Sequence, residues 1–582
     1  MEHKQETRNC QSCKKDFIID PEDFNFYEKI KVPPPTFCTE CRMVNRMLFR
    51  DYRSLHKRKS DKTNEIIFSI FHPKSNCKVI ERDIWWSDDW DALDYGKDIN
   101  FNDSFLKQVK ELFIEVPVAS QTGWNLINSD YCSGAHDLKN CYLIFVATFC
   151  EDCMYSAEIN NTKNSIDTTR IESSELCYES FGLIKCYKTF YSSHCEGCMD
   201  VWFSRNLVGC NFCFACTNLV NKQYFIYNKQ YTKDEYEKIV SDFNIGSYKS
   251  NLEIKKKVDE IMIKSIKKFM EGRKNLNVSG EYINNSKNVL SSYYINQAED
   301  SKYLQLFFSS NTKDCYDCTL WGEKVELCYE CSSVGSDAYN IRFCCRCSKG
   351  SRNCEYSFNC LSCSDIFGCS GLKSKQYCIL NKQYTKREYE ELVPKIRQHM
   401  IDMPYFDKMN RVYRYGDFFP SEFSLFSYNE SFAQDYFPLT KKDAMIKGYN
   451  WSEKEERNYK IDIKQEDIPD NILDVNDSII GKVIECLHYN VKDHFGLNCD
   501  DSCTEAFRIT GMELSFYKRI GLPLPRVCPN CRHFERIKMR NSIRLFKRRC
   551  MKEGCQNEFE TSYSPDRPEI VYCERCYQQE VY

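Results

Sequence analysis

Two stretches decide how this chain is organised: "CKKDFIIDPEDFNFYEKIKVPPPTFCTECR" (residues 13–42) and "CTEAFRITGMELSFYKRIGLPLPRVCPNCR" (residues 503–532). They align without a gap at an offset of 490 residues. Both begin at a cysteine and end in a cysteine pair followed by arginine, and aromatic and proline positions in between coincide, Phe17 with Phe507 and Pro33 with Pro523. The chain therefore carries one module twice, once near each end.

The cysteine spacing of the module predicts metal. Two cysteine pairs separated by a loop place four thiolates around a tetrahedral Zn²⁺ ion. The predicted ligands are Cys10, Cys13, Cys38 and Cys41 in the first copy, and Cys499, Cys503, Cys528 and Cys531 in the second. The first pair of the second copy has one extra residue, so Cys486, His488 or His494 are alternative ligands there. A closed four-thiolate site leaves no position for water, which predicts structural zinc.

A further set follows in the C-terminal copy: Cys550, Cys555, Cys573 and Cys576. In the N-terminal copy, Ser60 aligns with Cys550, and a small gap aligns Ile80 and Asp83 with Cys573 and Cys576. We expect this N-terminal counterpart to keep the ribbon shape without its metal. The sequence thus predicts about three Zn²⁺ ions.

Basic residues recur at steps of three and four after each second cysteine pair, which predicts one helix face. They are Arg42, Arg46, Arg50, Arg53 and Lys57 in the first copy, and Arg532, Arg536, Arg540 and Arg544 in the second. A row of guanidinium groups suits a phosphate backbone, RNA or DNA. The alternative is internal pairing with the chain's own carboxylates, for which the acidic residues 81–103 are available.

The composition limits the class of protein. The 582 residues are 42% hydrophobic and 14% aromatic, enough for several cores, and the net charge of −3 means that any basic surface is local. The 37 cysteines come without a signal-peptide pattern or an apolar run long enough to span a membrane. We therefore expect reduced thiols and a cytoplasmic protein.

The middle of the chain is repetitive. Cys132, Cys141, Cys150 and Cys153 recur 45 residues later as Cys177, Cys186, Cys195 and Cys198, among short strand-like words. This pattern is typical of a stacked β-solenoid. A larger duplication repeats residues 221–240 at 374–393, each with a Thr-x-x-Glu capping box that starts a helix (Thr232 and Thr385). The internal CxxC pairs are interpreted as core thiols, with further metal sites as the alternative.

These features predict a mostly β fold with α elements, in which terminal four-cysteine zinc ribbons flank a duplicated, cysteine-rich, β-solenoid-like middle. The expected organisation is a zinc ribbon with a basic helix (1–62), a metal-free ribbon with an acidic, tryptophan-bearing connector (63–125), a first solenoid half with its capping helix (126–245), a lysine-rich helical linker (246–290), a second half with its capping helix (291–400), a connector (401–485) and tandem C-terminal zinc ribbons (486–582).

The terminal modules resemble zinc-ribbon families with the pattern CxxC…F…FY…P…CxxCR. With "WWSDDWDALDYGKDINF", "YNESFAQDYFPLT" and "YSPDRPEIVYCERCY", most of the chain resembles a large cysteine-rich family of candidate-phylum bacteria and their phages. The resemblance implies zinc at the matching cysteines and no particular activity.

The sequence contains none of the common phosphate-loop, dinucleotide, metalloprotease or deaminase motifs, so no catalytic residue is predicted and the interpretation leans against an enzyme. The first hypothesis is a zinc-binding protein that contacts nucleic acid through the arginine rows. A protein-interaction scaffold with internally paired arginines is the alternative, and a metal-thiolate storage or redox protein is a third. No membrane partner is expected, and the oligomeric state is left open.

Overall fold

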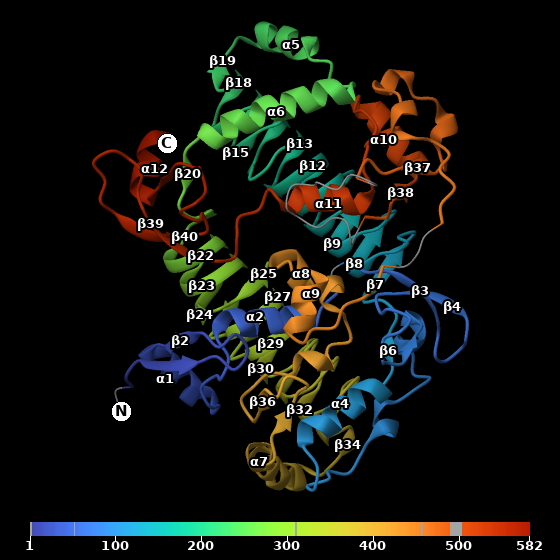
Figure 1. Ribbon diagram of the computed structural model, residues 1–582, viewed down its shortest axis with the longest axis vertical. Coiled ribbons are helices and arrows are strands. Elements are labelled where there is room, and N and C mark those ends of the chain that lie inside the picture. Colours follow the sequence, from blue (N-terminus) through green and yellow to red (C-terminus); the bar gives the residue numbers. More distant parts are fainter. Residues whose placement is uncertain (1–2, 52, 309–310, 455–457, 489–502, 582) are drawn as a thin grey trace.

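The computed structural model describes residues 1–582 except 1–2, 52, 309–310, 455–457, 489–502 and 582. The described chain is mostly β, with helices around two bodies of parallel strands (Figure 1). The predicted β class with α elements is confirmed at this level.

The first body of strands, called here the first stack, covers residues 123–230. Neighbouring strands in it are parallel and lie 12 residues apart in sequence, as in the pairs Ile166–Tyr178 and Val201–Cys213. A short antiparallel strand closes the series. In chain order the strands are β7 (Gly123–Ile127), β8 (Ser133–Lys139), β9 (Phe145–Glu151), β10 (Ala157–Asn160), β11 (Ile166–Glu172), β12 (Glu175–Ile184), β13 (Tyr187–Phe190), β14 (Met199–Trp202), β16 (Asn211–Phe214), β18 (Gln223–Ile226) and β19 (Lys229–Gln230), with β15 (Arg205–Val208) paired to β17 (Thr217–Val220) alongside.

The second stack covers residues 272–383 and is less regular. Its parallel pairs lie 11 to 14 residues apart, as in Leu276–Lys287, Val289–Ser301, Tyr316–Tyr329 and Lys302–Tyr316. Its strands are β21 (Gly272–Arg273), β22 (Leu276–Asn284), β23 (Lys287–Asn296), β24 (Ala298–Lys302), β25 (Gln305–Phe307), β26 (Thr312–Lys313), β27 (Tyr316–Gly322), β28 (Val325–Glu326), β29 (Tyr329–Gly335), β30 (Tyr339–Arg342), β31 (Arg352–Glu355), β32 (Ser364–Phe367), β33 (Gln376–Ile379) and β34 (Lys382–Gln383).

A regular backbone corner explains the 12-residue step of the first stack. From Asp137 to Glu179 every third residue has a positive φ. Such left-handed residues are unfavourable except for glycine, asparagine and aspartate. Because three divides twelve, each corner returns directly beside its predecessor. Asn128 donates from Nδ2 to Oδ1 of Asn140 at 2.9 Å, and Asn140 in turn donates to Asp152 at 3.1 Å, so the corner side chains form a hydrogen-bonded ladder.

The internal cysteines fill the core of each stack. Cys141 is buried, and its Sγ donates to the carbonyl of Lys139 at 3.4 Å and to that of Cys150 at 3.6 Å. Burial raises the pKa of Cys132 and of Cys150 to about 12, so both stay neutral thiols near neutral pH. Among the described residues, the cysteine groups with metal-binding geometry all lie outside the stacks. The internal thiols thus pack a narrow core.

Helices follow and cover the stacks. α5 (Lys233–Asp242) and α7 (Lys386–Asp402) begin at the predicted capping boxes of Thr232 and Thr385, both of which are formed. α6 (Tyr248–Lys264) lies across the first stack and leads into the second (Figure 1). None of the helices in the described ranges is long and apolar enough to cross a membrane.

The terminal modules form two ribbons at each end of the chain. The N-terminal pair consists of β1 (Glu6–Asn9), β2 (Asp16–Ile19), α1 (Pro21–Ile30) and α2 (Thr39–Leu48), then β3 (His56–Lys59), β4 (Ile66–Ser69), β5 (Val79–Ile80) and α3 (Arg82–Trp86). The C-terminal pair consists of β37 (Ile484–Glu485), β38 (Ala506–Phe507), α10 (Gly511–Ile520) and α11 (Pro529–Ile537), then β39 (Phe546–Arg549), β40 (Glu558–Thr561), β41 (Val571–Tyr572) and α12 (Glu574–Val581).

The two end modules are exchanged between the stacks. α2 packs against β27 and β29 of the second stack, whereas α11 packs against β11 and β12 of the first (Figure 1). The second ribbon of each end joins the other stack: β5 pairs with β6 (Val118–Ala119), which leads into the first stack, and β41 pairs with β20 (Lys267–Lys268), which leads into the second. Each end of the chain therefore bridges both stacks.

The remaining elements lie outside the two stacks in sequence. They are the 3-10 helices η1 (Ala92–Tyr95), η2 (Ser421–Phe423), η3 (Tyr428–Glu430), η4 (Gln465–Asp467), η5 (Ile472–Asp474) and η6 (Asp477–Ile479), the helices α4 (Phe105–Glu115), α8 (Phe432–Tyr436) and α9 (Lys441–Ile446), and the hairpin of β35 (Tyr405–Phe406) and β36 (Val412–Tyr413).

Candidate metal centres and the central cavity

The first candidate centre lies between the β1–β2 turn and the start of α2. The four sulfur atoms of Cys10, Cys13, Cys38 and Cys41 lie within 4.8 Å of one another. The turn is closed by Lys14, whose φ of 60° lets its amide donate to the carbonyl of Cys10 at 3.0 Å. The amide of Cys38 donates to Sγ of Cys10 at 3.3 Å. Backbone N–H groups thus already support negative sulfur at this site.

The second centre contains Cys486, which was predicted only as an alternative ligand. Cys486, Cys503, Cys528 and Cys531 are all buried and lie within 4.8 Å of one another. The amide of Cys528 donates to Sγ of Cys486 at 3.2 Å, as that of Cys38 does to Cys10. Cys486, from the end of β37, therefore occupies the position of Cys10. Cys499 and His494 lie outside the described residues.

The third centre consists of Cys550, Cys555, Cys573 and Cys576, again within 4.8 Å. The amide of Cys573 donates to Sγ of Cys550 at 3.3 Å, which repeats the arrangement of the other two centres. Burial raises the pKa of Cys573, but the amide and thiol of Cys576 outweigh it and lower this pKa to about 7. One sulfur of the group is therefore readily ionised, as metal binding requires.

The sulfur geometry of all three centres fits zinc. A tetrahedral ion with Zn–S bonds of about 2.3 Å separates its sulfur ligands by about 3.8 Å. The separations are 3.7 Å between Cys13 and Cys38, 3.5 Å between Cys528 and Cys531, and 4.0 Å between Cys555 and Cys573. The three groups could each hold a metal ion, in agreement with about three structural sites.

The N-terminal counterpart of the third centre has the same shape with different chemistry. The amide of Asp61 donates to the carbonyl of Val79 at 2.9 Å, as that of Met551 does to Val571 at 3.1 Å. This register aligns Glu81 with Cys573, so the predicted match of Ile80 to Cys573 is corrected by one residue, and Asp83 gives way to Ile84 as the counterpart of Cys576.

A hydrogen-bonded cluster stands where the third centre has sulfur. Oγ of Ser60 donates to Glu81 at 2.7 Å, and Thr63 donates to the other oxygen of the same carboxylate. Ser60 Oγ also accepts from the amides of Lys62 and Thr63 at 3.1 and 3.2 Å. We call Ser60, Thr63 and Glu81 the polar cluster. It links the same two chain segments that a metal would link.

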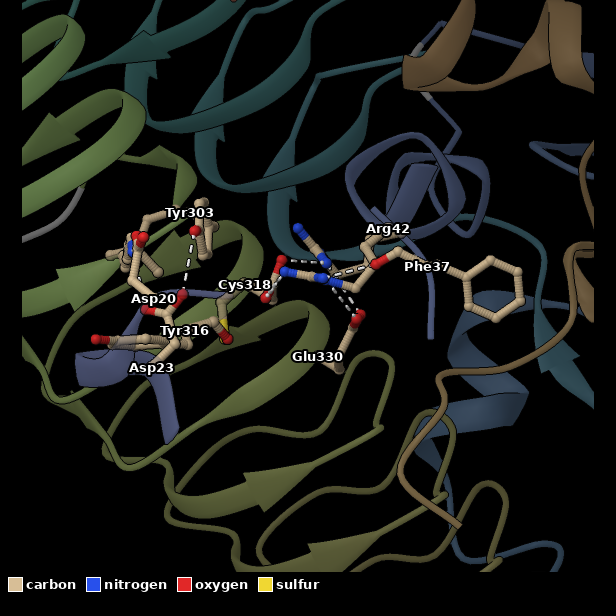
Figure 2. A network of polar contacts seen from close by, with 12 residues as sticks. Asp20, Asp23, Phe37, Arg42, Tyr303, Tyr316, Cys318 and Glu330 are labelled. Carbon is tan, nitrogen blue, oxygen red and sulfur yellow. Dashed lines mark hydrogen bonds and ion pairs between the residues drawn. The ribbon is translucent and has the colours of Figure 1, made fainter. Parts of the chain in front are cut away.

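The first pair of predicted nucleic-acid-binding arginines lies inside the protein. Arg42 forms ion pairs with Asp317 at 2.7 Å and Glu330 at 3.2 Å, and Arg46 pairs with the same two carboxylates at 3.1 and 2.9 Å. Figure 2 shows Arg42 pointing between Glu330 and the carbonyl of Phe37, to which it also donates at 2.7 Å. All four charged side chains are at most 5% exposed.

The second pair repeats this arrangement on the other stack. Arg532 pairs with Asp167 at 2.5 Å and Glu513 at 3.2 Å, and Arg536 pairs with Asp167 at 2.8 Å. Asp167 of β11 and Asp317 of β27 both lie on parallel strands and are fully buried. The four arginines therefore fix the end modules to the stacks through Asp317, Glu330 and Asp167, whereas Glu513 of α10 is a partner within the C-terminal module. Internal pairing was the alternative hypothesis, but these acceptors do not come from residues 81–103.

The other predicted basic residues do not continue the helix face, because α2 ends at Leu48 and α11 at Ile537. They are Arg50, Arg53, Lys57, Arg540 and Arg544. Lys57 is exposed, Arg540 lies over the ring of Tyr436 at 4.1 Å, and Arg544 pairs with Glu40 at 2.8 Å. Across the described residues, the predicted basic side chains thus do not form one solvent-facing row.

A cavity of about 760 Å³ lies between the two stacks. It was not predicted from the sequence. One wall comes from β7 to β12, the other from β21 to β23, β27 and β29, and Trp85 and Trp86 of α3 contribute at one side. Arg50 reaches it from the end of α2. The residues that form it are far apart in sequence, because its walls belong to both stacks.

Comparisons with known proteins add little. No protein-family model matches the chain, and no curated protein matches it. Among solved structures, the chain is similar to a "putative acetyltransferase" from Desulfovibrio desulfuricans G20, at 11% identity over 48% of this chain and 82% of that one. The TM-score is 0.09, so this likeness supports no conclusion about fold or function.

Proposed function

We propose that this protein is a non-enzymatic, zinc-binding scaffold in which metal-stabilised ribbons hold two strand stacks together. The observation that carries the proposal is the presence of three groups of four cysteine sulfurs, each within 4.8 Å. Four soft thiolates in a closed tetrahedron favour zinc and leave no position for a reacting water. The 12-residue step of the first stack also supports placing the middle in the β-solenoid class.

The buried arginine pairs support the scaffold over the surface that we predicted for nucleic acid. Arg42, Arg46, Arg532 and Arg536 already have carboxylate partners, and removing one partner from a buried pair costs about 3–5 kcal/mol. A phosphate backbone would have to displace these carboxylates from inside the protein. Contact with a polyanion therefore needs another surface.

Metal analysis tests the scaffold directly. The protein purified without added metal should contain about three zinc ions per chain, and a chelator should remove them with loss of cooperative unfolding. A value of six or more, or any stoichiometric iron, would contradict the proposal and favour the storage or redox function. The absorbance ratio at 260 and 280 nm of the same sample shows whether nucleic acid copurifies.

A further inference from the structure

The central cavity has more cationic than anionic side chains on its wall, although the chain as a whole is slightly acidic. Arg170 pairs with Glu158 at 2.5 Å, and Arg273 pairs with Glu196. The remaining lysines and arginines of the wall outnumber its remaining glutamates. The charged lining residues are Arg50, Arg170, Lys185, Arg273, Lys274, Arg346 and Lys349 against Glu158, Glu172, Glu196 and Glu271. The wall therefore attracts anions.

In the part of the chain that the structure describes, Arg50 is one of these cations with a guanidinium nitrogen that lacks a hydrogen-bond acceptor. Arg346 shares the neighbourhood and forms an ion pair with Asp51 at 3.4 Å, so two guanidinium groups face one carboxylate. Burial and the charge of Arg346 lower the pKa of Arg50 to about 10. Within the described residues, Nε of Arg50 and Nε of Arg346 have no hydrogen-bond partner. An anionic group beside them would supply the missing acceptor and the missing charge.

Two glycines make room for side chains that line the cavity: Gly134 lies in the wall itself, and Gly335 lies next to Trp321, which lines it. A Cβ atom at Gly134 would lie 2.5 Å from Nη2 of Arg50, and one at Gly335 would overlap the ring of Trp321. The guanidinium and the indole thus lie directly on the backbone of opposite stacks. Any larger residue at these two positions would move the side chain away from its present place.

Flat aromatic faces line one side of the same cavity. Trp86 and Trp124 are 37% and 39% exposed, and Nζ of Lys349 lies 4.6 and 4.7 Å from the centres of their rings. Trp124 also stacks on His136, with ring centres 4.4 Å apart and planes at 4°. Partial burial lowers the pKa of Lys349, although the residue is exposed. Exposed indole faces beside cations are favourable surfaces for a heteroaromatic ring.

We propose that the central cavity binds a ligand that combines a heteroaromatic base with phosphate, with the phosphate near Arg50 and the base on the tryptophan side. The volume of about 760 Å³ is in the range of small-molecule sites. A free nucleotide and the end of a single-stranded nucleic acid share this chemistry. The site goes beyond the scaffold function and uses none of the proposed zinc ligands.

Calorimetric titration of the full-length, metal-replete protein tests the proposal with ADP, adenosine, pyrophosphate and a short deoxythymidine strand. We expect ADP to bind more tightly than adenosine or pyrophosphate, because it alone occupies both ends of the site. Arg50→Gln should weaken ADP and pyrophosphate binding about tenfold or more and leave adenosine unchanged. Trp124→Ala should weaken ADP and adenosine and leave pyrophosphate unchanged.

A matched glycine pair separates the site from general strain. Gly134→Ala puts a methyl group against Arg50, whereas Gly481→Ala introduces a similar positive-φ penalty with nothing within 4 Å. The first should weaken ADP binding and the second should not, while circular dichroism and zinc content show that both variants are folded. This pair keeps the test valid if Arg50→Gln does not fold.

The outcomes are distinct. Binding of ADP without competition by the strand identifies a free nucleotide, and tighter, competing binding of the strand identifies a nucleic-acid end. The proposal is overturned if neither ADP nor the strand binds at millimolar concentration to protein that holds about three zinc ions. Equal ADP affinity of the wild type, Arg50→Gln and Gly134→Ala would overturn it as well. A metal-poor but nucleotide-binding protein would instead contradict the scaffold function alone.

Discussion

The two second ribbons, residues 56–86 and 546–581, show one shape held together by two kinds of chemistry. In the C-terminal ribbon four sulfurs meet, whereas in the N-terminal ribbon Ser60 and Thr63 donate to Glu81 at the equivalent positions. The N-terminal ribbon is also stabilised by a contact with a chain segment beyond the ribbon itself. Trp85 is 2% exposed and its Nε1 donates to the carbonyl of Pro117 at 3.1 Å. Packing and a hydrogen-bonded carboxylate thus link the segments of the N-terminal ribbon that cysteine sulfurs link in the C-terminal one.

The largest expected effect comes from removing a sulfur from the third centre. Cys550→Ser should lower the zinc content from about three to about two per chain and destabilise the C-terminal ribbon by on the order of 5 kcal/mol, because a structural metal is lost. Zinc analysis and thermal unfolding measure both effects. The matched control is Ser60→Ala, which should leave the zinc content unchanged and cost about 1 kcal/mol. Unchanged zinc in Cys550→Ser would show that the two ribbons do not differ in metal.

A smaller effect is expected from the carboxylate of the polar cluster. Glu81→Gln keeps the size of the side chain but removes its charge and one of its acceptor oxygens, so the free energy of unfolding should fall by about 1–2 kcal/mol. Urea unfolding followed by tryptophan fluorescence measures the change, since Trp85 lies in the same ribbon. Glu65→Gln, an exposed neighbour, is the control. Equal destabilisation by both changes would mean that the cluster does not hold the ribbon.

The smallest effect concerns pH. Burial opposes ionisation of Glu81, but hydrogen bonds from Thr63, its own backbone and Ser60 lower its pKa below the ordinary value of 4.5. A carboxyl group with a lowered pKa in the folded state stabilises the protein above its unfolded pKa, and this contribution is lost as the pH falls through the folded pKa. The difference in unfolding free energy between wild type and Glu81→Gln should therefore be constant near neutral pH and shrink below about pH 4.5. A difference that grows on acidification would contradict the lowered pKa.

The comparison also shows what the sequence could reveal. Cysteine spacing identified the first and third centres completely, because four ligands in two short pairs are a local pattern. It placed Cys499 in the second centre with Cys486 as an alternative; Cys486 belongs to the group, whereas Cys499 lies outside the described residues. Spacing alone could not choose Cys486, because it comes from the end of β37, and strand pairing is not visible in spacing. The alignment of Ile80 with Cys573 was wrong by one residue, because the loop lengths differ and only the backbone register identifies Glu81.

The helical spacing of the arginines could be predicted from the sequence, but their carboxylate partners could not. Their helical spacing was correct as far as Leu48 and Ile537, but the partners Asp317 and Asp167 are hundreds of residues away and look like ordinary strand residues. The three-residue period of left-handed corners was also missed, since residues such as Leu143 and Val146 rarely adopt that conformation. The cavity could not be predicted at all, because its walls belong to both stacks.

The exchange of end modules has a consequence for synthesis. Asp317 and Glu330 are synthesised long after Arg42 and Arg46. Helix α2 therefore cannot form these ion pairs until β27 and β29 have left the ribosome. In the first stack the order is reversed, because Asp167 is synthesised long before its partners Arg532 and Arg536. Until α11 is made and packs against β11, Asp167 therefore has neither of these two arginine partners.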